Sequence, residues 1–180
     1  MKNRLLRVGM VAVLALGVGS VVSAAPGGAA TPVQKCAHLK GSATLSPGIQ
    51  SAKKAQKVTA KGNLTSCAPT KATGGSGTIS ASLKVAPGNC TTLLNGGSKF
   101  TGTAKTVWKN KKTSSYTLTF VTGKGKNATV ATITGKVSAG LFKGKNVTGA
   151  IKFTPKAGQN CVTKPVTSVT FVNTKPFQIA

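Results

Sequence analysis

The feature that most constrains the fold is a two-residue alternation of apolar and polar side chains that runs from Leu39 onward. An apolar residue at every second position is typical of a β-strand with one buried side, whereas a helix has a period of 3.6. The alternating sets are Leu39/Gly41/Ala43/Leu45, Val58/Ala60/Gly62/Leu64, Ile79/Ala81/Leu83/Val85, Phe100/Gly102/Ala104/Trp108, Tyr116/Leu118/Phe120, Ala131/Ile133/Val137 and Val147/Ile151/Phe153. A last strand near 166–172 has apolar residues on both sides, which indicates a central or covered strand.

Clusters of turn-forming residues separate these segments at roughly regular intervals. They are Pro47-Gly48, Gly74-Gly75, Pro87-Gly88, Asn95-Gly96-Gly97 and Gly123-Lys124-Gly125. About eight short strands joined by such turns are typical of a sandwich or barrel. We therefore predict a single all-β domain over residues 35–180, an antiparallel β-sandwich or barrel, with at most one helical turn at 91–95.

The lysines test the register of these strands independently. Nine of them lie on the side opposite the apolar set of their own strand: Lys40, Lys57, Lys61, Lys84, Lys99, Lys105, Lys109, Lys136 and Lys152. A wrong register would place about half of them in the interior. The lysine positions therefore support the predicted strands.

Charge is the second constraint, because the chain has 25 Lys and Arg, no Asp or Glu, and a formal net charge of +25. Without carboxylates it lacks the residues for acid/base pairs, Ser-His-Asp triads, EF-hand loops and zinc sites with a Glu base. The single histidine, His38, lies on the polar side of its strand, and no motif singles out a Ser–Lys pair. We predict a protein that is not an enzyme and has no cofactor and no metal site.

The first 24 residues have the organisation of a secretory signal peptide. Lys2, Arg4 and Arg7 precede an apolar run at 8–22 that is short for a membrane span, and Val22-Ser23-Ala24 fits a cleavage site. An uncleaved anchor is the alternative. Residues 25–34 are predicted to be a flexible lead-in. The mature protein is expected to be secreted or cell-wall associated, without a membrane span.

Four cysteines follow the predicted signal peptide: Cys36, Cys67, Cys90 and Cys161. An even number in an exported chain favours two disulfides, for which three pairings exist. Cys36 and Cys67 bracket the first two predicted strands, so we predict the pairs 36–67 and 90–161.

Further lysines lie in the predicted turns. If successive strands are antiparallel, alternate turns share one end of the domain. This predicts one cluster of Lys109, Lys111, Lys112, Lys143 and Lys145, and a second cluster at the other end of Lys53, Lys54, Lys124, Lys126, Lys156 and Lys164. Solubility does not require the loss of every acidic residue, because Asp and Glu serve solubility at least as well. We therefore predict that the chain binds a polyanion. Both ends are basic and either could be the contact face; the first cluster is taken as the candidate site.

Arg4 and Arg7 lie in the predicted signal peptide, so the predicted mature chain carries lysine and no arginine. This favours a repetitive anion over specific nucleic acid, whose bases are usually read by Arg, Asn and Gln. We expect the protein to be a monomer. Its expected partner is an anionic cell-wall polymer such as teichoic acid, an acidic polysaccharide or anionic lipid head groups. The alternative function is that of a secreted cationic effector, either antimicrobial or an enzyme inhibitor. Trp108 and Tyr116 flank the lysine-rich turn; they are predicted to pack in the core rather than to stack on a sugar, because both share the apolar side of their strands.

Short motifs along the chain resemble those of small exported β-rich proteins of actinobacteria. These motifs are KGSAT at 40–44 with Pro47-Gly48, GNLTSC at 62–67, GNCTTLL at 88–94, Trp108 ahead of Lys112-Thr113-Ser114, GLFKG at 140–144, and Cys161. This chain departs from the pattern at Lys111, where relatives favour Gly, and in lacking the acidic residues that relatives generally keep. The resemblance implies an exported β-rich fold and carries over no active site.

Overall fold

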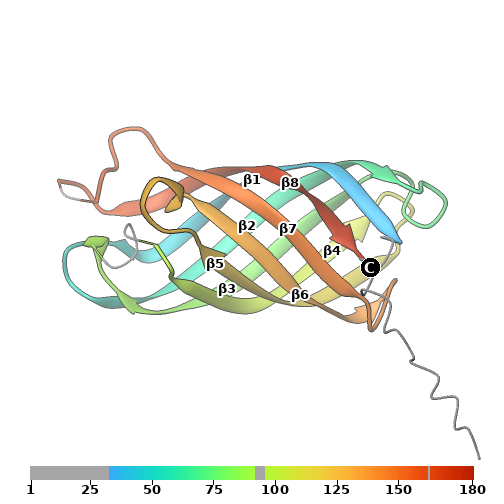
Figure 1. Cartoon of the computed structure of the whole chain (residues 1–180), viewed down its shortest axis with the longest axis horizontal. Helices are drawn as coiled ribbons and strands as arrows, with labels where there is room; N and C mark the ends of the chain where they lie inside the picture. Colours follow the sequence, from blue (N-terminus) through green and yellow to red (C-terminus); the bar gives the residue numbers. More distant parts are fainter. Residues whose placement is uncertain (1–32, 92–95, 162) are drawn as a thin grey trace, which may run out of the picture.

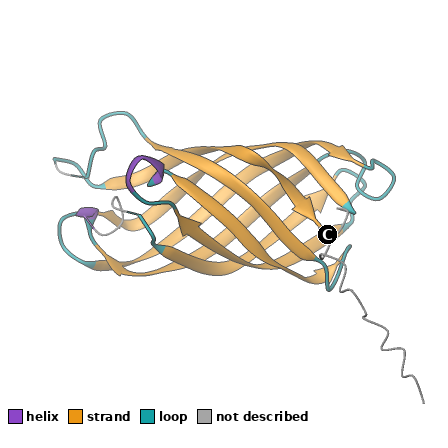
Figure 2. Ribbon diagram, viewed as in Figure 1, coloured by secondary structure: helices purple, strands orange, loops and turns teal. Residues whose placement is uncertain are grey.

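The computed structural model describes residues 33–91, 96–161 and 163–180, which form eight antiparallel strands closed into a barrel (Figures 1 and 2). The strands are β1 (Gln34–Ile49), β2 (Lys54–Ala68), β3 (Gly77–Gly88), β4 (Lys99–Trp108), β5 (Thr113–Thr122), β6 (Val130–Gly140), β7 (Asn146–Pro155) and β8 (Val166–Ile179). A 3-10 turn, η1 (Gly125–Asn127), lies between β5 and β6. The predicted all-β fold is confirmed, and of the two architectures left open the protein adopts the barrel.

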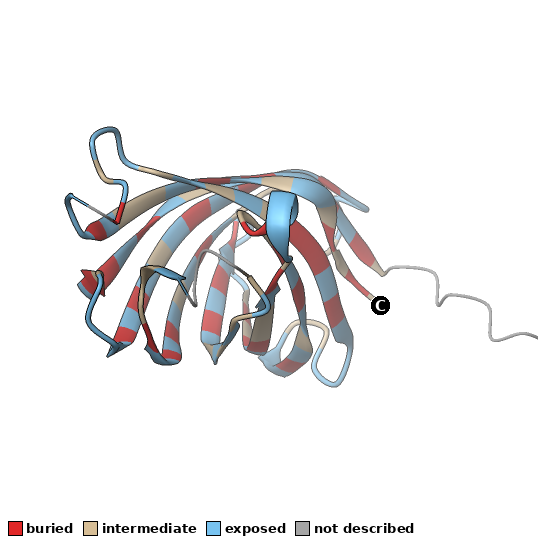
Figure 3. Cartoon of the chain, turned by 60° about the vertical axis from the view of Figure 1, so that its left-hand side comes forward, coloured by how far each residue is buried: buried red, intermediate tan, exposed pale blue. Residues whose placement is uncertain are grey.

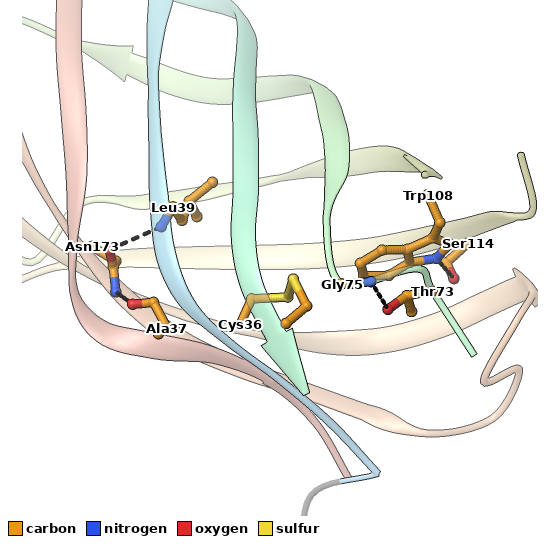
Figure 4. The surroundings of a disulfide bond; sticks show 9 residues. Cys36, Ala37, Leu39, Thr73, Gly75, Trp108, Ser114 and Asn173 are labelled. Carbon is orange, nitrogen blue, oxygen red and sulfur yellow. Dashed lines mark hydrogen bonds between the residues drawn. A yellow bond between two sulfur atoms is a disulfide. The ribbon is translucent and has the colours of Figure 1, made fainter. Parts of the chain in front are cut away.

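Each strand pairs with its neighbours in the sequence, and β8 closes the barrel by pairing with β1. The β1–β8 register shifts between Cys36 and Lys40, and the Asn173 side chain bridges this irregularity. Its Oδ1 accepts the Leu39 N–H at 2.9 Å and its Nδ2 donates to the Ala37 carbonyl at 2.7 Å (Figure 4). Closure leaves no sheet edge with unpaired backbone groups.

The predicted alternation holds around the barrel wall. Inward-facing Leu39, Leu64 and Leu118 are buried, and every lysine in the described ranges is exposed, which gives the banded burial pattern of Figure 3. The last strand differs from its prediction, because Val172 is 53% exposed on the outer wall opposite Lys40 and Lys152. The strand is central, because it pairs with both β1 and β7, but it is not covered, because each strand of a closed barrel has one solvent-facing side.

The two ends of the barrel are defined by alternate turns. The turns β2–β3, β4–β5 and β6–β7 share one end with the start of β1 and the end of β8, and we call this the plugged end (at the C label in Figure 1). The connections β1–β2, β3–β4, β5–β6 and β7–β8 form the other, open end.

Both predicted disulfides are confirmed. Cys36–Cys67 joins two directly paired residues of β1 and β2 near the plugged end. Cys90–Cys161 joins the β3–β4 and β7–β8 connections at the open end. One bond therefore lies within the wall and the other ties two loops together.

The predicted signal peptide, 1–24, and most of the predicted lead-in, 25–34, lie outside the described residues, as do residues 92–95 of the predicted turn at 91–95. The Val33 N–H donates to the Ile179 carbonyl at 2.8 Å, and β1 begins at Gln34. The barrel wall thus starts one residue before the predicted domain boundary and includes the last residue assigned to the lead-in.

Candidate polyanion-binding surface and barrel interior

Aromatic side chains seal the plugged end from within. Trp108 is 1% exposed, and its Nε1 donates to Ser114 Oγ at 2.9 Å (Figure 4). The Ser114 hydroxyl in turn donates to the Leu141 carbonyl at 2.9 Å. Phe142 packs edge-on against the Trp108 ring at a centroid distance of 6.3 Å. Tyr116 packs in the same way against Phe177, at 5.9 Å. Trp108 and Tyr116 are core residues, as predicted.

The structure brings the five lysines of the predicted site to the plugged end. Lys109, Lys111 and Lys112 lie in the β4–β5 turn, whereas Lys143 and Lys145 lie in the β6–β7 turn, and all are exposed. The Leu141 N–H donates to the Thr113 carbonyl at 2.8 Å, so the two turns are held side by side together with the Ser114 relay. The turns present their charges from a fixed backbone.

A sixth lysine, Lys71 in the β2–β3 turn, was missed by the sequence reasoning. Asn110 Nδ2 donates to the Ala72 carbonyl, and the Lys109 N–H donates to the Ser76 carbonyl at 2.9 Å. This turn is therefore bonded to the β4–β5 turn. Its position could have been predicted, because by the rule that alternate turns share an end the β2–β3 turn lies beside the β4–β5 turn. We call these six residues the plugged-end cluster: Lys71, Lys109, Lys111, Lys112, Lys143 and Lys145.

The second predicted group also shares one end. Lys53, Lys54, Lys124, Lys126, Lys156 and Lys164 lie in or beside the β1–β2, β5–β6 and β7–β8 connections and are exposed. We call them the open-end cluster. The remaining candidate, His38, is exposed on the outer wall of β1. Within the described ranges, no three residues of the types His, Cys, Asp and Glu come together as a metal-ligand group.

Strand pairing also creates a lysine group that the sequence reasoning did not find. Lys57 on β2 lies directly opposite Lys84 on β3, and with Lys99 they line a shallow depression in the outer wall. Like charges placed directly opposite each other destabilise a sheet, and the chain has no acidic residue to compensate them. Only the register between strands reveals this group.

The barrel interior contains an apolar cavity of about 140 Å³. All eight strands contribute to its lining, which includes Leu45, Ile79, Phe100, Ile133 and Phe171. Phe177 forms part of its boundary toward the plugged end, and Cys161 part of its boundary toward the open end. The cavity therefore lies between the aromatic plug and the loops of the open end.

Several buried polar groups lie beside the aromatic side chains that fill the plugged end, which we call the plug. The hydroxyls of Tyr116 and Thr106 and both amide atoms of Gln34 are buried without a hydrogen-bond partner. Burial raises the pKa of Tyr116 to about 12. The Thr106 and Ser114 hydroxyls lie near enough to oppose part of this increase, but they do not reach hydrogen-bond geometry with the phenol. Such unpaired groups cost stability, because they lose their hydrogen bonds to water on folding.

These features define the class: a small antiparallel β-barrel with two disulfides, an apolar interior and an outer surface charged by lysine alone. Comparisons with protein-family models, with curated protein sequences and with solved structures found no match. The disulfides are typical of proteins from an oxidising, extracellular environment. In the part of the chain that the structure describes, no helix is long and apolar enough to cross a membrane.

Proposed function

We propose that this protein is an exported, non-enzymatic binding protein that contacts anionic cell-envelope polymers through the plugged-end cluster. The observation that supports this function is the unneutralised charge of the barrel surface. Every described lysine is exposed, and the chain has no Asp or Glu with which any of them could pair. The positive field of the surface is therefore available to an external anion.

The plugged end is the proposed contact face because hydrogen bonds between its turns fix its lysines in place. Three turns joined by backbone and side-chain hydrogen bonds carry six of them. The buried Trp108 supports the turns from below, so less backbone freedom is lost when a ligand binds.

Lysine determines which anions suit this face. Its ammonium is a flexible point charge without the fork geometry by which arginine selects planar phosphate or carboxylate groups. Phosphate polymers and carboxylate polymers of equal charge density are therefore expected to bind comparably. A repeating polymer, such as wall teichoic acid or an acidic polysaccharide, engages several lysines at once.

The test is the salt dependence of binding to purified wall teichoic acid, polyphosphate and alginate. Engaging six to ten anionic groups is expected to weaken binding about 10³–10⁵-fold between about 50 and about 200 mM salt, by analogy with nucleic acids. Insensitivity to salt would overturn the proposal.

Two variants with the same net charge test the face. The plugged-end variant, K109Q/K111Q/K112Q/K143Q/K145Q, should make the log–log salt slope shallower by roughly three to four, at roughly 0.7 per lost contact. The open-end variant, K53Q/K54Q/K124Q/K126Q/K156Q, removes equal charge and should change the slope less. Equal changes in both variants would show that the plugged end is not the contact face.

Cellular assays separate this function from that of an antimicrobial effector. Retention of the protein on the wall of the producing cells, without killing of other bacteria, supports the proposal. Killing without wall retention contradicts it.

A further inference from the structure

The interior of the barrel is underfilled by its own side chains. Ala43, Ala60, Ala81 and Ala104 lie in one continuous row of paired positions across β1 to β4 and face inward. The interior of an eight-stranded barrel is just wide enough for side chains to fill it or for one small ligand to bind. Because these four alanines lie on four adjacent strands, they leave a space inside the barrel that Leu or Ile at the same positions would occupy.

A large side chain from the strand next to β1 fills only part of this space, because Phe171 of β8 is the direct partner of Gly41. The Phe171 ring from β8 reaches Gly41, where an added Cβ would lie 2.6 Å from its Cζ atom. Beside this contact the apolar cavity of about 140 Å³ remains. Its size is close to that of the engineered 150 Å³ apolar protein cavity known to hold benzene. The space therefore suits a slender hydrocarbon rather than a bulky polycyclic one.

Part of the lining of this cavity is incompletely covered by the protein's own side chains. Phe100, Phe120, Phe153, Ile151 and Val169 face inward and pack against the core, yet each is only partly buried. At the plugged end, by contrast, Trp108 and Phe177 are each 1% exposed. These five half-buried side chains lie in the open-end half of the barrel, where covering them with a ligand is favourable. Leu141 and Phe142 at the plugged end are also half-buried, but they lie in the β6–β7 turn and do not line the cavity.

The entrance is ringed by positive charge. The open-end cluster supplies six exposed lysines from three connections, and Lys99 adds another at the start of β4. The Lys124 side chain passes over the backbone of Gly97 in the β3–β4 connection, since a Cβ on Gly97 would lie 3.4 Å from Lys124 Cε. An apolar pocket with a cationic rim matches a molecule that has one hydrocarbon chain and an anionic head.

We propose that the barrel interior binds a free single-chain anionic amphiphile, such as a fatty acid. The chain lies in the apolar cavity between the alanine row and the aromatic side chains, and the carboxylate lies among the open-end lysines. This site is separate from the polymer-binding face, so each proposal can fail without the other.

Calorimetric titration of the purified protein with n-alkanoates from hexanoate to hexadecanoate tests the site without any mutation. Each methylene that enters the cavity is expected to increase affinity about fourfold, until the cavity is full and the increase stops. Dodecanoate should bind at least about fivefold more tightly than dodecanol, and dodecyltrimethylammonium more weakly than either. Affinity independent of chain length, or equal for the three head groups, would overturn the proposal.

Filling the cavity tests its location. Ala81→Leu places a larger side chain in the alanine row and should weaken dodecanoate binding at least about tenfold, while Ser82→Leu adds the same group to the exposed outer wall and should not. Ala60→Leu is the second variant in case the first does not fold. Unchanged binding in a folded cavity-filling variant would show that the amphiphile binds outside the barrel.

The two charge variants complete the test. The open-end variant should remove the preference for dodecanoate over dodecanol, and the plugged-end variant should retain it. The opposite result would move the head group to the polymer-binding face. Loss of polymer binding with retained amphiphile binding would count against the proposed function alone.

Discussion

The two ends of the barrel are built from the same eight strands, yet large aromatic side chains are fully buried at one end and only partly buried at the other. At the plugged end, Trp108, Tyr116 and Phe177 are each 1% exposed. At the open end, Phe100, Phe120 and Phe153 face inward but are only partly buried. Strand number alone therefore does not decide whether such a barrel is filled, because the size and packing of the inward side chains differ along its axis.

Buried polar groups are better hydrogen-bonded at the open end than at the plugged end. At the open end the buried Gln56 Oε1 accepts the Gly48 N–H and Thr122 Oγ1 accepts the Ser98 N–H, both at 2.9 Å. At the plugged end the polar atoms of Gln34, Thr106 and Tyr116 have no partner. The end with the tighter apolar packing thus also carries the unpaired polar groups, and the two effects can be measured separately.

The largest expected difference between the ends is in how much large-to-small substitutions lower the free energy of unfolding. Trp108→Ala removes a fully buried ring and should lower the free energy of unfolding by about 4 kcal/mol. Phe153→Ala removes a ring that already contacts solvent and should cost only about 1–2 kcal/mol. Urea denaturation measures both, and equal losses would show that the open end is packed as tightly as the plug.

The next prediction is a loss of stability at high pH that is caused by Tyr116 at the plugged end. The pKa of Tyr116 is raised from 10.0 to about 12 by burial, so between these values the folded protein binds more protons than the unfolded chain. Stability therefore falls as the pH rises through this window, by up to roughly 2–3 kcal/mol for this group. Comparing wild type with Tyr116→Phe isolates the contribution, because the variant lacks the titrating group. An identical fall in both proteins would contradict it.

A smaller effect comes from paired substitutions of two buried threonines. Thr106→Val removes a hydroxyl without a partner and should stabilise the protein by about 1 kcal/mol. Thr122→Val removes the acceptor of the Ser98 N–H and should destabilise it by about the same amount. Thermal unfolding of the two variants under identical conditions gives the comparison. If both substitutions stabilise the protein, or both destabilise it, the two ends do not differ in the hydrogen bonding of their buried polar groups.

Much of the barrel wall was predictable because its information is local. The period of two assigned the inward and outward sides, placed Lys40, Lys61 and Lys105 outside, and put Trp108 and Tyr116 in the core. Cysteines that bracket two successive strands predicted a bond between neighbours, which the pairing of Cys36 with Cys67 confirms. The resemblance to exported actinobacterial proteins stays a prediction.

The parts that were not predicted depend on how separate strands align. Closure requires β1 and β8, at opposite ends of the domain sequence, to pair, and Val172 became exposed for that reason. The alanine row and the Lys57–Lys84 pair exist only in one inter-strand register. Alternation within a strand does not specify that register, so neither the cavity nor the outer lysine group could be derived from the chain alone.

The last prediction concerns acid, where the two ends should behave alike. Acid unfolding results mainly from the protonation of carboxylates that are paired or hydrogen-bonded in the native protein. This chain has no Asp or Glu at either end, and its one histidine is exposed on the outer wall. The melting temperature should therefore stay nearly constant from about pH 2 to about pH 7, with a change below about 10 °C. Calorimetry across this range checks the expectation, and a larger fall on acidification would contradict it.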